Sequence, residues 1–343
     1  MREQVVWLAV VLTIAACDGR GAGDGGGPAV DAAPGSGDDG GDGDDGGGGL
    51  VGDPAEPGRD PVHCQDDVPI ALGGASTVRG TVCSPADGGG APAPGPFPLI
   101  VVSSGYQLAR SQYRGYCEHL ASWGHVCVTH DYAASGNHQD KAREVGKIID
   151  WALGTTSGLA VRVDGARIGV AGHSLGGKVS INAAILDARI QAVVGWDPVD
   201  ALPPFGNDGS ASVTPEMMGA LRVPIAVLGE LTDASGGLGG LSCAPAADNY
   251  QQFFERACAA AATLEVTIAM ADHMDWIGDR GACGLACLAC QSGQTTDATV
   301  HAITRRVTTA WFERHLRDVA AMDAWLAPGM IGVPTTVRTA PGC

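Results

Sequence analysis

Arg167-Ile168-Gly169-Val170-Ala171 runs directly into Gly172-His173-Ser174-Leu175-Gly176-Gly177 near the middle of the chain. The first five residues form a short, mostly apolar run with β-branched side chains, which predicts a buried strand. The next six contain a G-x-S-x-G turn, in which the serine is strained and the glycines leave room for neighbouring backbone. A helical pattern begins near Ser174. Strand, turn and helix in succession predict a nucleophile elbow with Ser174 as the nucleophile.

Short apolar runs alternate with amphipathic stretches on both sides of this turn. We expect strands over residues 77–84, 98–104, 126–130, 167–171, 192–196, 223–229 and 264–271. Helices are expected over residues 142–153, from about 174, over 248–262 and over 300–316. Buried β-branched runs that alternate with helices predict an α/β protein, with a mostly parallel central sheet and helices on both faces.

A serine hydroxyl is a weak nucleophile and needs a base, which in such a fold comes last in the order serine, acid, histidine. Of the nine histidines, only His273 follows a late apolar strand. His301 and His315 fall on the expected C-terminal helix, and His173 lies in the elbow itself. We expect those three to pack or to orient the turn, so His273 is the predicted base.

Two aspartates follow strands at positions suitable for the acid. Asp197 follows the strand after the elbow helix, and Asp233 follows the next strand. Either carboxylate could orient the imidazole and stabilise its cation. The periodicity of the sequence does not choose between them.

The N-terminus resembles an export signal. Arg2 is followed by an apolar run over residues 5–16, which is shorter than the roughly 20 residues that a membrane-spanning helix needs. The run ends in Ile14-Ala15-Ala16-Cys17, which resembles the bacterial lipoprotein box. We expect a lipoprotein signal peptide over residues 1–16, a lipid anchor at Cys17 and export to the bacterial cell envelope, the alternative being an ordinary signal peptide with an incidental cysteine.

Residues 17–60 are expected to form a flexible tether, and residues 61–343 the folded domain. The tether is mostly Gly, Asp, Ala and Pro, so it has little apolar surface to offset the entropy of ordering. Its Asp-Gly alternation imitates a calcium loop but lacks the bidentate Glu at the twelfth position, so no metal site is predicted. The net charge of −17 and the absence of any basic run exclude a nucleic-acid partner.

Ten cysteines remain after Cys17, an even number that in an exported chain predicts disulfides. They are Cys64, Cys83, Cys117, Cys127, Cys243, Cys258, Cys283, Cys287, Cys290 and Cys343. The triplet Cys283-x3-Cys287-x2-Cys290 also looks like the one that holds an iron–sulfur cluster in radical-SAM enzymes. Its place late in an exported chain, after a hydrolase-like core, argues against that cluster. A zinc site would need a fourth ligand nearby, and none has suitable spacing. We therefore expect neither metal nor cofactor, and at least two cysteines of the triplet to be oxidised.

Several motifs in order resemble the chlorophyllase branch of the α/β-hydrolases, and more distantly the bacterial polyester hydrolases and the platelet-activating-factor acetylhydrolases. The resemblance runs from about Pro98 to about Leu316. It is carried by Gly105-Tyr106, His119-Leu120-Ala121-Ser122-Trp123-Gly124-His125, Gly172-His173-Ser174 with Gly176-Gly177-Lys178, Asp197-Pro198-Val199-Asp200, Cys243-Ala244-Pro245 with Asn249 and Phe253-Phe254, and His273-Met274-Asp275. It implies an α/β-hydrolase fold.

The resemblance also implies the roles of individual residues. Ser174 would be the nucleophile, His273 the base and Asp197 the acid, while Asp233 stands where polyester hydrolases carry theirs. The backbone amides of Tyr106 and Leu175 would form the oxyanion hole.

Two further expectations depend on the resemblance. Cys243 would pair with Cys258 across a chlorophyllase-like segment. Chlorophyllases usually carry Arg after the serine and His before the oxyanion glycine, where this chain has Leu175 and Ser104. We therefore expect a substrate other than chlorophyll.

The expected function is an exported carboxylic ester hydrolase that works through an acyl-enzyme. Apolar side chains beside the motifs would bind the substrate, namely Tyr106, Trp196, Met274 and Trp276. No Lys or Arg lies within three residues of the three catalytic positions, and Lys178 follows Ser174 by four, so neutral apolar esters are the expected substrates. A catalytically silent binding protein on the same fold and a cluster-binding redox protein are the rival hypotheses. A membrane would be contacted only through the lipid anchor.

Overall fold

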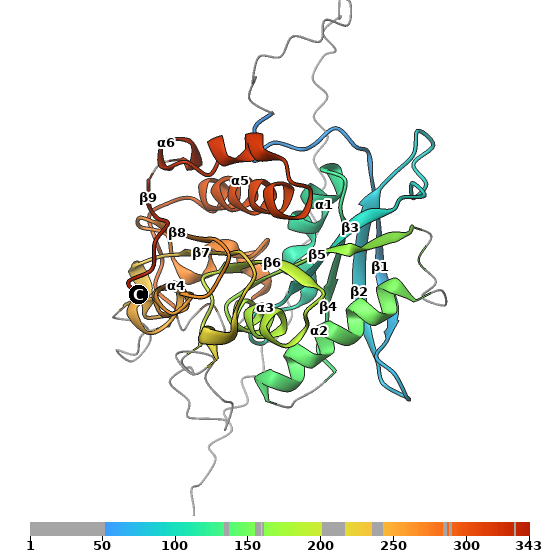
Figure 1. Ribbon diagram of the computed structural model, residues 1–343, viewed down its shortest axis with the longest axis horizontal. Helices are drawn as coiled ribbons and strands as arrows, with labels where there is room; N and C mark the ends of the chain where they lie inside the picture. The colour runs from blue at the N-terminus through green and yellow to red at the C-terminus, as the bar shows by residue number, and fades with distance from the viewer. Residues whose placement is uncertain are drawn as a thin grey trace, which may run out of the picture. The chain divides into compact units, whose positions relative to one another are not determined.

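The computed structural model describes residues 52–133, 137–154, 159, 161–200, 217–234, 243–283, 287, 290–332 and 334–343 (Figure 1). Within these residues, nine strands form one sheet in the order β1-β2-β4-β3-β5-β6-β7-β8-β9. Strands β3 to β8 run parallel, whereas β1, β2 and β9 pair antiparallel with their neighbours. The α/β-hydrolase fold is therefore confirmed, as a mostly parallel sheet covered by helices.

The elements follow one another in the order strand, crossover helix, strand through the centre of the chain. The strands are β1 (Val62–Ala71), β2 (Thr77–Pro85), β3 (Phe97–Ser103), β4 (Val126–His130), β5 (Val163–His173), β6 (Ile190–Trp196), β7 (Ile225–Gly229), β8 (Thr263–Ile268) and β9 (Thr335–Arg338). The α-helices are α1 (Arg114–Ser122), α2 (His138–Leu153), α3 (Leu175–Leu186), α4 (Tyr250–Glu255), α5 (Asp297–Leu316) and α6 (Pro328–Ile331). Short 3-10 turns include η1 (Arg110–Tyr113), η3 (Thr232–Ala234), η6 (His273–Trp276) and η7 (Arg280–Ala282).

Both faces of the sheet are buried, as the side chains of β3 show by pointing alternately to one face and the other. Leu99 and Val101 point into a core shared with α2 and α3, whereas Ile100 and Val102 point into a core shared with α1 and α5. All four side chains have no exposed surface. Figure 1 shows the two pairs of helices on opposite sides of the sheet. Because both faces are covered, the central strands are nearly continuous apolar runs, and this is why the sequence revealed them.

Three parts of the fold differ from the expectation. Strand β1 was not predicted because its pairing with β2 is interrupted between Gln65 and Val68, which breaks the alternation of apolar and polar residues. Strand β9 was missed because it has only four residues. Helix α4 ends at Glu255, so the helix expected over residues 248–262 is much shorter than its apolar pattern indicates.

The folded domain begins before the predicted boundary at residue 60. Asp53 forms an ion pair with Arg306 of α5 at 2.5 Å, and the carbonyl oxygen of Pro54 lies 2.9 Å from His119 Nε2 of α1. Ala55 is 4% exposed. The polar composition of this segment gave no sign that it is ordered, because backbone and charged groups hold the segment in place. Residues 1–51, with the predicted signal peptide and Cys17, lie outside the described residues.

The ten cysteines of the domain form five disulfides, as the even count indicates. The pairs are Cys64–Cys83, Cys117–Cys127, Cys243–Cys290, Cys258–Cys343 and Cys283–Cys287. The expected pairing of Cys243 with Cys258 is wrong: Cys243 is joined to Cys290, which follows η7, and Cys258 is joined to the C-terminal residue Cys343. Cysteines on either side of a helix can bond to different neighbours, because the helix separates them in space.

The C-terminal segment covers β8. Strand β9 pairs with it in antiparallel register, Val266 opposite Val337. Arg338 donates from Nε to Glu265 on β8 at 2.7 Å and also pairs with Glu255 at the end of α4. Cys343 then bonds to Cys258. Among the described helices, none is both long and apolar enough to cross a membrane.

Candidate active site

The predicted elbow is present at the end of β5. Ser174 has φ 57° and ψ −124°, between a strand that ends at His173 and a helix that starts at Leu175. A Cβ atom at Gly176 would lie 2.0 Å from the carbonyl oxygen of Ser103 on β3, and one at Gly172 would lie 2.4 Å from Gly176 O. No side chain fits at either position, so glycines are required where helix, turn and neighbouring strand meet.

The structure brings the three predicted catalytic residues together. His273 Nε2 lies 2.9 Å from Ser174 Oγ, and His273 Nδ1 lies 2.5 Å from Asp197 Oδ2. Asp197 occupies a tight turn after β6 with φ 41°, and its amide donates to Leu228 O of β7 at 2.7 Å. The three side chains come from the carboxyl ends of β5, β6 and β8. This geometry allows a proton to move from the serine to an imidazole that a carboxylate orients.

Asp233, the other candidate acid, supports the same histidine through its backbone. Its Oδ2 accepts from the amide of His273 at 2.9 Å, and its Oδ1 accepts from the amide of Gln291 at 2.7 Å. Asp233 thus joins the histidine loop to the segment that follows Cys290, while Asp197 contacts the imidazole. The sequence could not separate these roles, because both aspartates follow parallel strands at the same edge of the sheet.

Burial makes charge costly throughout this site. It raises the pKa of Asp197, with the charge of Asp233 adding to the effect, and it lowers the pKa of His273. Burial together with the neighbouring Asp197 raises the pKa of Glu230 to about 10. A negative charge on Asp197 therefore disfavours a second negative charge on Glu230.

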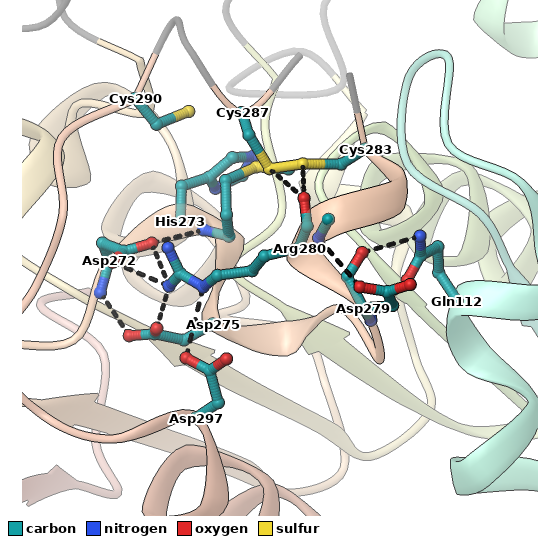
Figure 2. Close-up of a disulfide and its surroundings, with 12 residues drawn as sticks. Gln112, Asp272, His273, Asp275, Asp279, Arg280, Cys283, Cys287, Cys290 and Asp297 are labelled. Carbon is teal, nitrogen blue, oxygen red and sulfur yellow. Dashed lines mark hydrogen bonds and ion pairs between the residues drawn. A yellow bond between two sulfur atoms is a disulfide. The ribbon is translucent and has the colours of Figure 1, made fainter. Parts of the chain in front are cut away.

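The loop that carries His273 is held by a cluster of charged groups (Figure 2). Asp272 and Asp275 form a capping box around η6, with Asp272 Oδ1 accepting from Met274 N at 2.9 Å and Asp275 Oδ2 accepting from Asp272 N at 2.7 Å. Arg280 donates to both oxygens of Asp272 at 2.8 Å and also pairs with Asp275 and Asp297.

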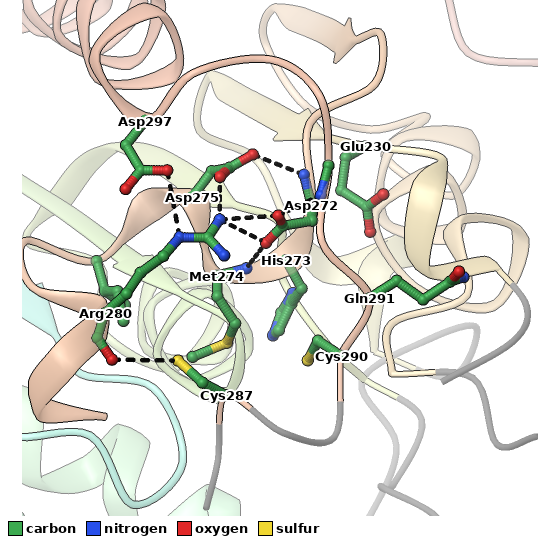
Figure 3. Close-up of polar contacts among 12 residues, drawn as sticks. Glu230, Asp272, His273, Met274, Asp275, Arg280, Cys287, Cys290, Gln291 and Asp297 are labelled. Carbon is green, nitrogen blue, oxygen red and sulfur yellow. Dashed lines mark hydrogen bonds and ion pairs between the residues drawn. The ribbon is translucent and has the colours of Figure 1, made fainter. Parts of the chain in front are cut away.

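Figure 3 shows Arg280 between these carboxylates, beside Met274 and His273. Both capping aspartates are buried, so the guanidinium compensates much of their negative charge. Burial nevertheless raises the pKa of Asp275 to about 7. This cluster was not predicted, although acidic residues on both sides of His273 are a usable signal for it.

The two oxyanion-hole candidates lie on different segments, one directly after the serine and one after β3. Leu175 is the first residue of α3, so its amide has no acceptor within the helix. Tyr106 follows β3, in a turn where Gln107 has φ 56° and Leu108 N donates to Gly105 O at 3.2 Å. The side chain of Tyr106 is 55% exposed.

The residues expected to bind substrate fall into two groups. Tyr106 is exposed. The other three are buried: Met274, which lies beside His273 in Figure 3, is 3% exposed, and Trp196 and Trp276 have no exposed surface. The indole of Trp196 donates to Thr308 Oγ1 of α5 at 3.0 Å and packs on Tyr116 of α1, so the structure places it in the core. It lies on the face of β6 that points toward α1 and α5.

The cysteine triplet does not form a cluster of free thiols in the structure. Cys283 bonds to Cys287, and Cys290 bonds to Cys243. Asp233, Cys243 and Cys290 bring three potential ligand atoms within 4.8 Å of one another. The two sulfur atoms are joined, however, and both oxygens of Asp233 accept backbone amides. In the described part of the chain, the disulfide and the Asp233 carboxylate therefore hold loops together.

Comparison with known proteins agrees with the fold. The family model described as chlorophyllase matches residues 90–337. Chlorophyllase-1 of Arabidopsis thaliana is 26% identical over 245 residues, 65% of this chain and 73% of that protein. Chlorophyllase-2 of the same plant is 27% identical over 185 residues, 47% of this chain and 55% of that protein. The bis(hydroxyethyl) terephthalate hydrolase of Streptomyces coelicolor is 30% identical over 105 residues, 30% of this chain and 34% of that protein. The family match covers more than half of the residues of this chain, so the chain belongs to the chlorophyllase family.

Proposed function

We propose that the protein is a serine carboxylic ester hydrolase in which Ser174, His273 and Asp197 form the catalytic triad. The observation that carries this proposal is the continuous chain Ser174 Oγ, His273 Nε2, His273 Nδ1 and Asp197 Oδ2, with contacts of 2.9 and 2.5 Å at a nucleophile elbow. The related ester hydrolases support the same reaction class.

The mechanism follows from these positions. Ser174 Oγ attacks the ester carbonyl carbon while its proton moves to His273 Nε2, and Asp197 stabilises the imidazolium. The amides of Tyr106 and Leu175 stabilise the negative oxygen of the tetrahedral intermediate. The intermediate collapses as His273 returns the proton to the departing alcohol, which leaves an acyl-enzyme. Water then attacks the acyl carbon, His273 takes its proton, and the acid is released as Ser174 regains that proton.

Reaction with a fluorophosphonate probe separates this proposal from a silent binding protein. We expect the probe to label wild-type protein at Ser174 and not to label Ser174→Ala. Hydrolysis of p-nitrophenyl esters should fall by at least about 10³ in the variant, because the nucleophile is lost. Wild-type protein that neither reacts with the probe nor hydrolyses any ester of the series would favour the binding protein.

The assignment of Asp197 as the triad acid yields a second prediction. Asp197→Asn should lower kcat by about 10⁴, as loss of the orienting aspartate does in serine proteases. Asp233→Asn should have a much smaller effect, since it retains an oxygen for one of the two backbone amides that Asp233 now accepts. Steady-state kinetics of both variants decide the matter. Near-normal turnover of Asp197→Asn with loss in Asp233→Asn would reverse the assignment.

We infer that neutral, apolar esters are the preferred substrates. Three basic residues of the elbow helix and of the neighbouring loops have carboxylate partners. Lys178 lies 3.1 Å from Asp200, Arg110 pairs with Asp67 and Asp131, and Arg280 pairs with three aspartates. An anionic substrate would find no free charge-assisted partner among them. Exposed Tyr106 offers apolar contact instead.

This preference can be measured as a ratio of kcat/KM values. A neutral short-chain ester should be hydrolysed at least about tenfold more efficiently than an isosteric ester with a carboxylate in its acyl chain, because the anion is desolvated without a partner. Equal or better turnover of the anionic ester would show that a cation reaches the substrate after all.

We also propose that the enzyme is exported and anchored by a lipid at Cys17. The five disulfides support a compartment outside the cytoplasm. Labelled palmitate should enter the wild-type protein in a bacterial host and should not enter Cys17→Ser. Equal labelling of the two would exclude this anchor.

A further inference from the structure

A buried hydroxyl connects the oxyanion loop to the nucleophile elbow. The amide of Gly105 lies 3.1 Å from Tyr113 Oη, and this oxygen lies 2.9 Å from His173 Nδ1. On the other side of the ring, His173 Nε2 lies 2.8 Å from the carbonyl oxygen of His273. These contacts link a turn after β3, the residue before the nucleophile and the backbone of the proposed base.

The protons in this series of hydrogen bonds have one consistent arrangement. A carbonyl oxygen only accepts, so His173 Nε2 carries a proton and donates to His273 O. Burial lowers the pKa of His173 well below its usual range, so the ring is neutral and Nδ1 is an acceptor. Burial also raises the pKa of Tyr113, so its hydroxyl is protonated and donates to Nδ1. The same oxygen accepts from the amide of Gly105.

The surrounding packing leaves these groups little freedom to move. Tyr113 and His173 have no exposed surface. A Cβ atom at Gly105 would lie 3.1 Å from Tyr113 Oη and 3.2 Å from His173 Nδ1, so residue 105 is tightly enclosed by the two side chains. The His173 ring also lies against the rings of His273 and Trp276, with centroids 4.7 and 6.2 Å apart.

The connection completes the support of the base. Asp233 accepts from the amide of His273, and His173 donates to its carbonyl oxygen, so both backbone groups of this residue are held by side chains. Asp197 and Ser174 contact its imidazole. The position of His273 relative to the oxyanion loop therefore depends on the hydrogen bonds that run through His173 and Tyr113.

We propose that Tyr113 and His173 are positioning residues that set the distance between the oxyanion amide of Tyr106 and the base His273. This inference rests on the proposed function, because it assigns the two ends of the chain to one ester-hydrolysing site. Neither side chain needs to touch substrate. Their effect would appear mainly in the transition state, where the oxyanion forms and a small displacement of donors is costly.

The test compares Tyr113→Phe with Tyr116→Phe. Each change removes one phenolic oxygen from a buried ring that packs near Trp196, but only Tyr113 contacts Gly105 and His173. We expect Tyr113→Phe to lower kcat by about tenfold with KM changed less than twofold. Its affinity for a trifluoromethyl ketone, which forms an oxyanion on the serine, should fall by about the same factor. Tyr116→Phe should keep wild-type values of all three, whatever its effect on Tm.

Hydrogen–deuterium exchange gives a readout that does not depend on activity. Peptides that cover residues 104–108 and 272–275 should exchange faster in Tyr113→Phe than in Tyr116→Phe or wild type. Identical exchange and kinetics in the two variants would overturn the proposal, and so would a rise in KM with unchanged kcat. If wild-type protein hydrolysed no ester, the proposed function would fail, and the exchange experiment would still decide whether Tyr113 holds these two loops.

Discussion

The close approach of β5, its following turn and α3 to β3 is the constraint on which the rest of the site depends. Gly172 and Gly176 permit it, because no Cβ atom fits between them and the backbone of Ser103. The turn then leaves Ser174 with a positive φ, its amide bonded to Trp196 O at 3.0 Å and its hydroxyl directed to His273. Packing of the central sheet thus stabilises a conformation that a serine would not adopt alone.

The base is held in a different way from the nucleophile. His273 lies on a four-residue 3-10 turn, which supplies few backbone hydrogen bonds of its own. Side chains replace them: the capping box of Asp272 and Asp275, Arg280 between these carboxylates, and Asp233 on the His273 amide. A buried polar network of this kind is effective only when its members are paired, so the loop depends on several charged residues at once.

The sequence predicted the parts of the molecule that depend on local pattern. The apolar runs of β3 to β8 and the elbow at Ser174 were predicted correctly, and His273 was selected because it follows β8. The local pattern of the sequence did not predict contacts between segments that are distant along the chain. The acid remained open because Asp197 and Asp233 have equivalent local settings, and the pairing of Cys243 was wrong because a helix separates it from Cys258. Trp196 was expected beside the substrate, but the last side chain of such a strand can point to either face of the sheet, and here it points to α5.

The two ends of the sheet bear on how the protein behaves when concentrated. An unpaired edge strand can template association with a second chain, and natural proteins guard such edges with bulges, charges or covering segments. At one end, β1 has an interrupted register and exposed carboxylates at Asp66 and Asp67. At the other, the short strand β9 lies over β8, Arg338 pairs with Glu265, and the bond between Cys343 and Cys258 fastens the last residue. Reduction of that bond would free residue 343 while β9 stays paired with β8, so protection of this edge depends on the strand pairing and on Arg338 as well as on the disulfide.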